Sequence, residues 1–267
     1  MPPKFKRLLG VIARAACVTI VATFSSPGRA AELRVLSAAA MQSVFKEIRD
    51  DFQRTTGYRL LLHYGTVGAV DEWTMAGEEA DLIISSSRSM RWLVHQGKIQ
   101  PGSETTICQT GIGIVTAAGI ELSVESVEDF KKALLGAKAI VYADPARGGA
   151  AGIHVAKVIG RLGLTEQLKP KLRLAAGGDI TEVTLSLGPG ALGITQISEI
   201  ADKPEAQLVG VLPEEQQSYT VFVAGMPASA PQSQGAAALL KFLRSPKTIA
   251  VIRAKGMKDF GSDGGSE

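Results

Sequence analysis

Four short loops of this 267-residue chain carry residue types suited to holding a small anion. They consist mostly of small, hydroxyl-bearing or glycine residues. Where such a loop enters a helix, a ligand can reach bare backbone N–H groups at the helix N-terminus, where the helix dipole favours negative charge. For any single loop of this kind a tight βα turn is the favoured interpretation, but four such loops together favour a site for a small anion. The loops are Ser37–Met41, Gly65–Gly68, Ser85–Arg88 and Asp144–Gly152.

Other site chemistries find little support. Arg147 stands where a dinucleotide-binding fingerprint needs glycine, and no Lys-Ser or Lys-Thr pair follows to complete a phosphate-binding loop. The three histidines, His63, His95 and His154, are scattered without metal-ligand spacing, and no Gly-x-Ser-x-Gly motif is present. We therefore expect no metal and no cofactor. His154 follows the glycine-rich loop and is kept as a candidate site residue.

The elements that position these loops alternate between apolar strands and amphipathic helices. This βαβ pattern predicts α/β lobes with mostly parallel sheets, and it restarts near residue 107, which suggests two lobes. Ligands of such sheets bind beyond the carboxyl ends of the strands, where the four loops lie. The predicted strands are 33–36, 60–64, 81–85, 107–116, 139–142, 191–195 and 219–224; the predicted helices are 41–56, 70–76, 126–136, 152–162 and 180–187, with two more closing the chain.

The positive charge of the chain is confined to its start. The formal net charge is +3, but residues 1–30 hold five basic and no acidic side chains, and the rest carries 24 basic against 26 acidic ones. A basic start, an apolar stretch over 8–24 and small residues before Ala30 predict a secretory signal peptide, 1–30, cleaved after Ala30. An uncleaved anchor is the alternative, although Arg14 interrupts a stretch already short for a bilayer. We expect a periplasmic protein that binds no nucleic acid.

Cys108 is the only cysteine beyond this predicted signal. A lone thiol cannot form an internal disulfide, and its place in the apolar run 107–115 favours a buried small hydrophobe over a nucleophile. At the other end, the tail 261–267 is predicted to be disordered.

Several stretches of the chain resemble the periplasmic molybdate-binding proteins of ABC importers. The resemblance implies a two-lobed type II periplasmic binding protein, in which crossover strands near 109–110 and 219–220 join the lobes. Lobe 1 would hold 31–109 plus 220–260, and lobe 2 would hold 110–219. It also implies a small anionic ligand and a permease partner at the inner membrane, and we expect a monomer. The stretches that carry it are Leu33–Met41, Ala76–Ser85, Tyr142–Pro145 with Ala151 and Gly152, and Leu192–Ile194.

The side chains that hold oxyanions in that family are replaced here. The resemblance places Ala40 and Val67 where the family has ligand serines, and Gln196 where it has a tyrosine. Backbone donors at Ala151 and Ile180 would remain. Because a buried dianion lacking three hydroxyl donors would be poorly stabilised, strict molybdate specificity is not expected.

A second resemblance points to an organic ligand. Residues 193–199, 209–213 and Gly225 with the helix 236–243 resemble a divergent branch of the family that includes bacterial aconitate isomerase. This branch implies a small polycarboxylate in the cleft. Arg147 could hold a carboxylate through a bidentate fork, or it could be a solvent-facing loop charge.

Two hypotheses of different classes follow. The first is a binding protein for an ABC importer, which needs only a cleft and is favoured for that reason. The second is an isomerase that shifts a double bond of a tricarboxylic acid by proton transfer, with His154, Asp179 or Tyr64 as the base. Asp179 is also expected to cap the helix that begins at Ile180. The candidate ligand-binding residues are Ser37, Ala38, Ala40, Thr66, Val67, Gly68, Ser86, Arg147, Ala151, Gly152, Ile180 and Gln196.

Overall fold

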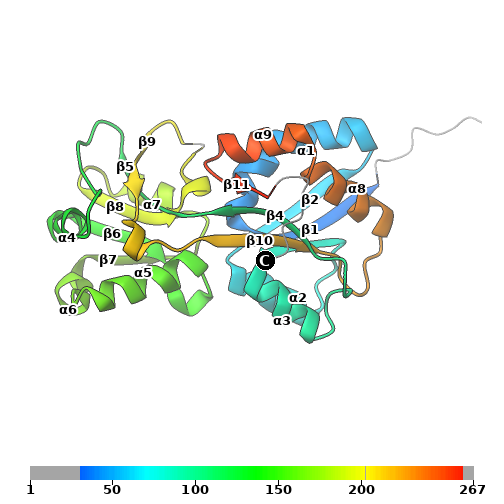
Figure 1. Ribbon diagram of the computed structural model, residues 1–267, viewed down its shortest axis with the longest axis horizontal. Coiled ribbons are helices and arrows are strands. Elements are labelled where there is room, and N and C mark those ends of the chain that lie inside the picture. The colour runs from blue at the N-terminus through cyan, green and yellow to red at the C-terminus, as the bar shows by residue number, and fades with distance from the viewer. Residues whose placement is uncertain (1–30, 202, 261–267) are drawn as a thin grey trace, which may run out of the picture.

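A computed structural model of the chain describes residues 31–201 and 203–260, whose strands form two separate sheets (Figure 1). The six-stranded sheet has the order β11-β4-β10-β3-β1-β2, and the five-stranded sheet has the order β7-β6-β8-β5-β9. Each sheet is covered by its own helices, so the molecule has two α/β lobes side by side (Figure 1). The predicted signal peptide and the predicted disordered tail lie outside the described residues.

The first lobe is built on three parallel strands, β1, β2 and β3. Helices α1, α8 and α9 lie on one face of this sheet, and α2 and α3 lie on the other (Figure 1). Side chains of β3 alternate between the two faces, with Leu82 and Ile84 in one core and Ile83 in the other. The elements of this lobe are β1 (Glu32–Ala38), α1 (Gln42–Thr56), β2 (Arg59–Gly65), α2 (Val67–Ala76), β3 (Leu82–Ser86), α3 (Ser87–His95), β4 (Thr105–Thr110), β10 (Thr220–Gly225), α8 (Ser233–Leu243), α9 (Pro246–Ala254) and β11 (Lys258–Asp259).

The second lobe repeats the arrangement. Strand β6 pairs in parallel with β7 and β8, while β5 pairs antiparallel with β8 and β9. Ser126 caps α4 as predicted, because its hydroxyl accepts the backbone N–H of Asp129 at 3.1 Å. The elements are β5 (Ile112–Ala117), α4 (Val127–Gly136), β6 (Ala139–Ala143), α5 (Ala150–Arg161), α6 (Thr165–Leu168), β7 (Leu172–Ala175), α7 (Ile180–Ser186), β8 (Ala191–Gln196) and β9 (Ala206–Val211).

The prediction of one strand over 107–116 was wrong. The chain forms β4 in the first sheet, leaves it at Gly111 and enters the second sheet as β5. The break cannot be recognised from the apolar sequence, because both strands are largely buried. The two strands differ in the strands with which they pair. The chain returns to the first sheet between β9 and β10, and these two crossings connect the lobes (Figure 1).

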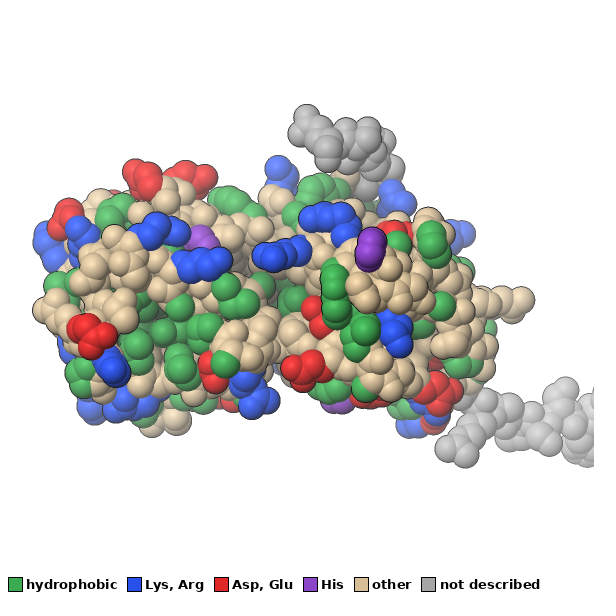
Figure 2. Space-filling view, turned by 90° about the horizontal axis from the view of Figure 1, so that it is seen from below, with side chains coloured by type: hydrophobic (Ala, Val, Ile, Leu, Met, Phe, Trp, Pro, Cys, Tyr) green, Lys and Arg blue, Asp and Glu red, His purple; other side chains and the backbone are tan. Residues whose placement is uncertain are grey.

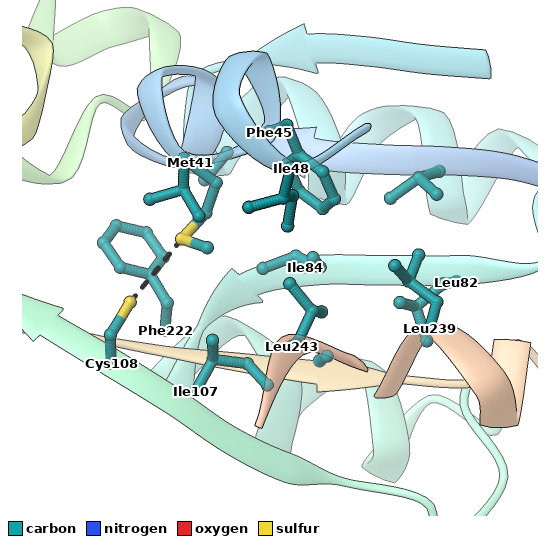
Figure 3. Packing of buried hydrophobic residues seen from close by; sticks show 14 of the residues in the cluster. Met41, Phe45, Ile48, Leu82, Ile84, Ile107, Cys108, Phe222, Leu239 and Leu243 are labelled. Carbon is teal, nitrogen blue, oxygen red and sulfur yellow. Dashed lines mark hydrogen bonds between the residues drawn. The ribbon is translucent and has the colours of Figure 1, made fainter. Parts of the chain in front are cut away.

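The core of the first lobe contains Cys108, which confirms the interpretation of this residue as a buried hydrophobe. Its Sγ lies 3.6 Å from the Sδ of Met41 and next to Phe222 (Figure 3). The side chain is fully buried, and burial raises the pKa of the thiol. The predicted apolar face of α1 points into the same core, through Val44, Phe45, Ile48 and Phe52. Within the described ranges, no helix is long and apolar enough to cross a bilayer.

Candidate ligand-binding cleft

The candidate site is a cleft between the lobes, at the carboxyl ends of β1 and β2 on one side and of β6 and β8 on the other. The free space inside it is about 30 Å³, and about 370 Å³ when the open mouth is counted, so the cleft is narrow in this conformation. Lobe 1 contributes an apolar wall, since it supplies Ala38, Ala39, Ala40, Gly65, Thr66 and Val67, together with Phe222. Lobe 2 contributes glycines and alanines, and also the polar side chains Thr195, Gln196 and Glu199.

The N-terminus of α5 opens into this cleft. No side chain caps the helix, and Ala150 and Ala151 of its first turn line the cleft. The first-turn N–H groups of a helix have no partner within the helix, and its dipole is positive at this end. A negatively charged group in the cleft would therefore meet backbone donors from lobe 2.

Six of the residues predicted from the sequence line this cleft, and the others do not. Gly68, Ser86 and His154 lie instead on a neighbouring side groove between α2, α3 and α5. Figure 2 shows the side of the molecule on which these three helices lie. Ser37, Gly152 and Ile180 lie behind the lining, and neither Arg147, Asp179 nor Tyr64 is part of it. The six lining residues are Ala38, Ala40, Thr66, Val67, Ala151 and Gln196.

Thr66, Gly68 and Arg147 take part in a direct contact between the lobes. The Thr66 hydroxyl donates to the backbone oxygen of Arg147 at 2.6 Å and accepts the N–H of Ala69 at 3.0 Å. The N–H of Gly68 donates to the oxygen of Gly148 at 3.1 Å. Arg147 therefore contributes its backbone to the closed conformation, while the residue as a whole is exposed and absent from the cleft lining.

Gly152 and Ile180 lie outside the cleft lining and position the helices whose N-termini point toward it. A Cβ on Gly152 would lie 1.9 Å from the backbone oxygen of Ala143, so glycine is needed for α5 to pack on β6. Ile180 is buried with Val141 and Ala143 at the start of α7. Both residues hold helix N-termini near the cleft without placing a side chain in it.

The three residues named as candidate bases lie away from the cleft lining. A ring nitrogen of His154 is 2.7 Å from the oxygen of Gln216. Tyr64 packs on Phe45 in the first lobe, where burial raises the pKa of its phenol. Asp179 occupies the N-cap position of α7, but the prediction that it caps this helix was wrong, because its carboxylate accepts the N–H of Gly177 at 3.1 Å and no N–H of α7.

Glu199 is the ionisable residue of the cleft lining that the sequence reasoning missed. Its carboxylate accepts a hydrogen bond from the hydroxyl of Thr195. Burial raises the pKa of Glu199 to about 7, and the negative charges of Glu182 and Asp179 add to this effect. The carboxyl group can therefore both donate and accept a proton near neutral pH. An acidic residue just after the fully buried strand β8 was the signal that could have identified it.

Gln196 offers a second unusual polar group. Its Oε1 is buried and has no hydrogen-bond partner among the described residues, while its Nε2 donates to the hydroxyl of Thr220 at 3.2 Å. An unpaired buried amide atom costs stability, so it is readily explained if a ligand completes its hydrogen bonding. Gln196 and Glu199 together give the lobe 2 wall hydrogen-bonding capacity beyond backbone N–H groups.

Comparisons with known proteins match this arrangement. A family model described as bacterial extracellular solute-binding protein matches residues 33–258. Aconitate isomerase of Pseudomonas sp is 24% identical over 233 residues, covering 85% of this chain and 87% of that protein. The molybdate-binding protein ModA of Azotobacter vinelandii is 25% identical over 238 residues, covering 85% and 90%.

A solved structure agrees with the fold. The periplasmic molybdate-binding protein of Azotobacter vinelandii superimposes with a TM-score of 0.72 at 21% identity, covering 84% of this chain and 98% of that chain. This likeness confirms the two-lobed α/β fold of type II periplasmic binding proteins predicted from the sequence.

Proposed function

The chain belongs to the bacterial extracellular solute-binding proteins, and from this premise we propose that it captures a small organic polycarboxylate in the interlobe cleft for an ABC importer. The proposal includes export to the periplasm through the signal peptide predicted over residues 1–30. Delivery to a permease at the inner membrane is supported by the membership of the chain in this family.

The residues that line the cleft favour an organic polycarboxylate over a tetrahedral oxyanion. Lobe 1 lines the cleft with the apolar residues Ala40, Val67 and Phe222. Lobe 2 presents backbone donors at α5 and the side chains of Gln196 and Glu199. A tetrahedral dianion would meet donors only on the lobe 2 side and would lose hydration against the apolar wall of lobe 1. A polycarboxylate combines an apolar carbon skeleton with anionic ends, and therefore fits both walls.

A ligand panel tests this proposal. Residues 31–267 are purified and melted with molybdate, tungstate, sulfate, citrate, tricarballylate, and cis- and trans-aconitate. We expect a polycarboxylate to stabilise the protein, by about 3 kcal/mol when present at about 100 times its Kd. Stabilisation by molybdate or tungstate alone would contradict the organic ligand.

A second function, isomerisation of an unsaturated tricarboxylic acid, is supported by Glu199 and by the similarity to an aconitate isomerase. In this reaction the Glu199 carboxylate takes a proton from a methylene carbon, the double bond moves, and the protonated carboxyl returns the proton two carbons away. The step is balanced without an oxidant. The hydrogen bond from Thr195 would hold the carboxyl group in place.

An assay of turnover separates the two functions. Interconversion of cis- and trans-aconitate is followed by proton NMR with wild-type protein and with Glu199→Gln. An isomerase would show turnover that the substitution removes while ligand binding persists. No turnover at high protein concentration would leave the binding function alone.

A further inference from the structure

A second hollow lies between the lobes, next to the cleft. We call it the rear pocket and define it by Gln42, Ser43 and Lys46 of α1 and by Glu182, Ser198 and Lys203 of lobe 2. Three further residues, Ala39, Gly178 and Glu199, line both the rear pocket and the cleft, so the two hollows share a wall. The two lobes are in close contact at this wall, because a Cβ on Gly178 would lie 2.9 Å from the Cβ of Ala39.

Two serine hydroxyls of the rear pocket lack partners. Ser43 is 6% exposed and Ser198 is 1% exposed, and the Oγ of each is buried without a hydrogen bond among the described residues. They come from opposite lobes, since Ser43 lies in the first turn of α1 and Ser198 in the short turn Ile197–Glu199 after β8. Buried hydroxyls without partners are costly and rare, so their presence at one hollow points to a polar guest.

The electrostatics of the rear pocket indicate the charge of that guest. Helix α1 has no acidic residue in its first turn and no side-chain cap, so its positive end lies at Gln42 and Ser43. Two basic residues, Lys46 and Lys203, line the pocket from the two lobes. Lys203 is paired with Glu182.

Glu199 is the other acidic group of the rear pocket. Its negative charge near neutral pH is reduced, because burial raises its pKa to about 7. An anionic group with two or more acceptor oxygens suits these surroundings.

We propose that the rear pocket is a second carboxylate-binding site, in which the hydroxyls of Ser43 and Ser198 donate to the carboxylate from opposite lobes. The carboxylate comes either from the far end of the ligand held in the cleft or from a separate small carboxylate. In both cases it bridges the lobes and favours the closed conformation. The proposal rests on the proposed function of the cleft, to which it adds the means of recognising more than one carboxylate.

The test compares Ser43→Ala and Ser198→Ala with wild type by calorimetric titration of acetate, succinate and tricarballylate. Ser186→Ala is the control, because Ser186 is exposed and its hydroxyl donates only to the Val183 oxygen. Each rear-pocket substitution is expected to weaken tricarballylate binding about 10- to 100-fold, the effect of removing one hydrogen bond to a charged group. The melting temperature without ligand should stay level or rise, since a buried unpaired hydroxyl has been removed.

The stoichiometry identifies the source of the carboxylate. One tricarballylate per chain, with acetate binding unchanged in the variants, indicates the far end of the cleft ligand. Two ligands per wild-type chain and one per variant indicate a separate carboxylate. If both variants bind tricarballylate as tightly as wild type, the proposed carboxylate site in the rear pocket is refuted, and the proposed function of the cleft is unaffected. If no carboxylate binds the wild type, the proposed function of the cleft fails as well.

Discussion

At the scale of single residues, Glu199 is the group that most distinguishes this cleft. Glu199 lines both the cleft and the rear pocket, and its carboxyl group accepts a hydrogen bond from the Thr195 hydroxyl. Burial favours the neutral acid, and the carboxylates of Glu182 and Asp179 reinforce this effect against the hydrogen bond from Thr195. Two consequences follow, one for stability and one for ligand binding.

The stability of the protein should depend on pH through this residue. The pKa of Glu199 rises from 4.5 to about 7 on folding, so the folded state binds more protons between these values and the free energy of unfolding falls as pH rises through this window. The total loss is about 3 kcal/mol. Urea unfolding at pH 5 and pH 8 measures it. Glu199→Gln should remove the part of the slope due to this residue, whereas the exposed control Glu166→Gln should retain it.

The affinity of the cleft for a carboxylate ligand should also change as Glu199 ionises. Above pH 7 the ionised Glu199 repels a carboxylate in the cleft, so binding should weaken as pH rises from 6 to 8. Calorimetry with tricarballylate on wild type and Glu199→Gln measures the effect. Equal pH profiles in the two proteins would show that another group controls binding.

At the scale of secondary-structure elements, the close packing of α5 on β6 positions the helix N-terminus at the cleft. The contact depends on Gly152, where a Cβ would lie 1.9 Å from the backbone oxygen of Ala143. A backbone oxygen cannot move aside as a flexible side chain can. The N–H groups of Ala150 and Ala151 therefore reach the cleft because the next residue has no side chain.

Two substitutions in this one helix test the argument. Gly152→Ala should destabilise the protein by about 1–3 kcal/mol, because α5 must move off the sheet. Gly160→Ala is the matched control, since the nearest atom to its Cβ would be the Thr165 Oγ1 at 3.9 Å, and alanine should stabilise the helix by up to about 1 kcal/mol. Thermal and urea unfolding measure both. Equal effects at the two positions would contradict the packing account.

At the scale of the whole molecule, the lobes meet through glycines. Gly68 of α2 and Gly148 after β6 approach so closely that a Cβ on Gly68 would lie 2.7 Å from the Cα of Gly148 and 2.8 Å from the Arg147 oxygen. Hinge closure is a usual motion of two-lobed binding proteins, and the closed form depends on such contacts. Gly68 and Arg147, selected from the sequence as ligand residues, thus belong to the contact that closes the cleft.

Gly68→Ala should hinder closure without harming either lobe. Gly68 lies in the first turn of α2, where alanine is compatible with the helix, so the melting temperature without ligand should be unchanged or higher. Ligand affinity should fall about tenfold or more, because the lobes no longer meet around the ligand. Calorimetry and small-angle scattering with ligand measure the two effects, with Gly160→Ala as the control. Wild-type affinity in Gly68→Ala would show that this contact is not needed for binding.

The sequence by itself determined the elements whose signal is local. Alternating and helical periodicities identified β1, α1 and β8, and the order of strands and helices gave the α/β class. Short sequence stretches carried the resemblance to the family, and both conclusions are confirmed. The edge strands β7 and β9 were not predicted, since their partly exposed residues carry little apolar pattern. The signal peptide stays a prediction.

Only the tertiary structure decided what the loops do. Whether a loop residue faces the cleft, as Ala40 does, or closes it, as Gly68 does, depends on the other lobe, which lies far away in sequence. The pKa of Glu199 and the unpaired hydroxyls of Ser43 and Ser198 likewise depend on burial, which only the folded structure determines. Local sequence patterns indicate which residues face a core. The pKa of a side chain and its hydrogen-bond partners depend on neighbours that only the fold brings together.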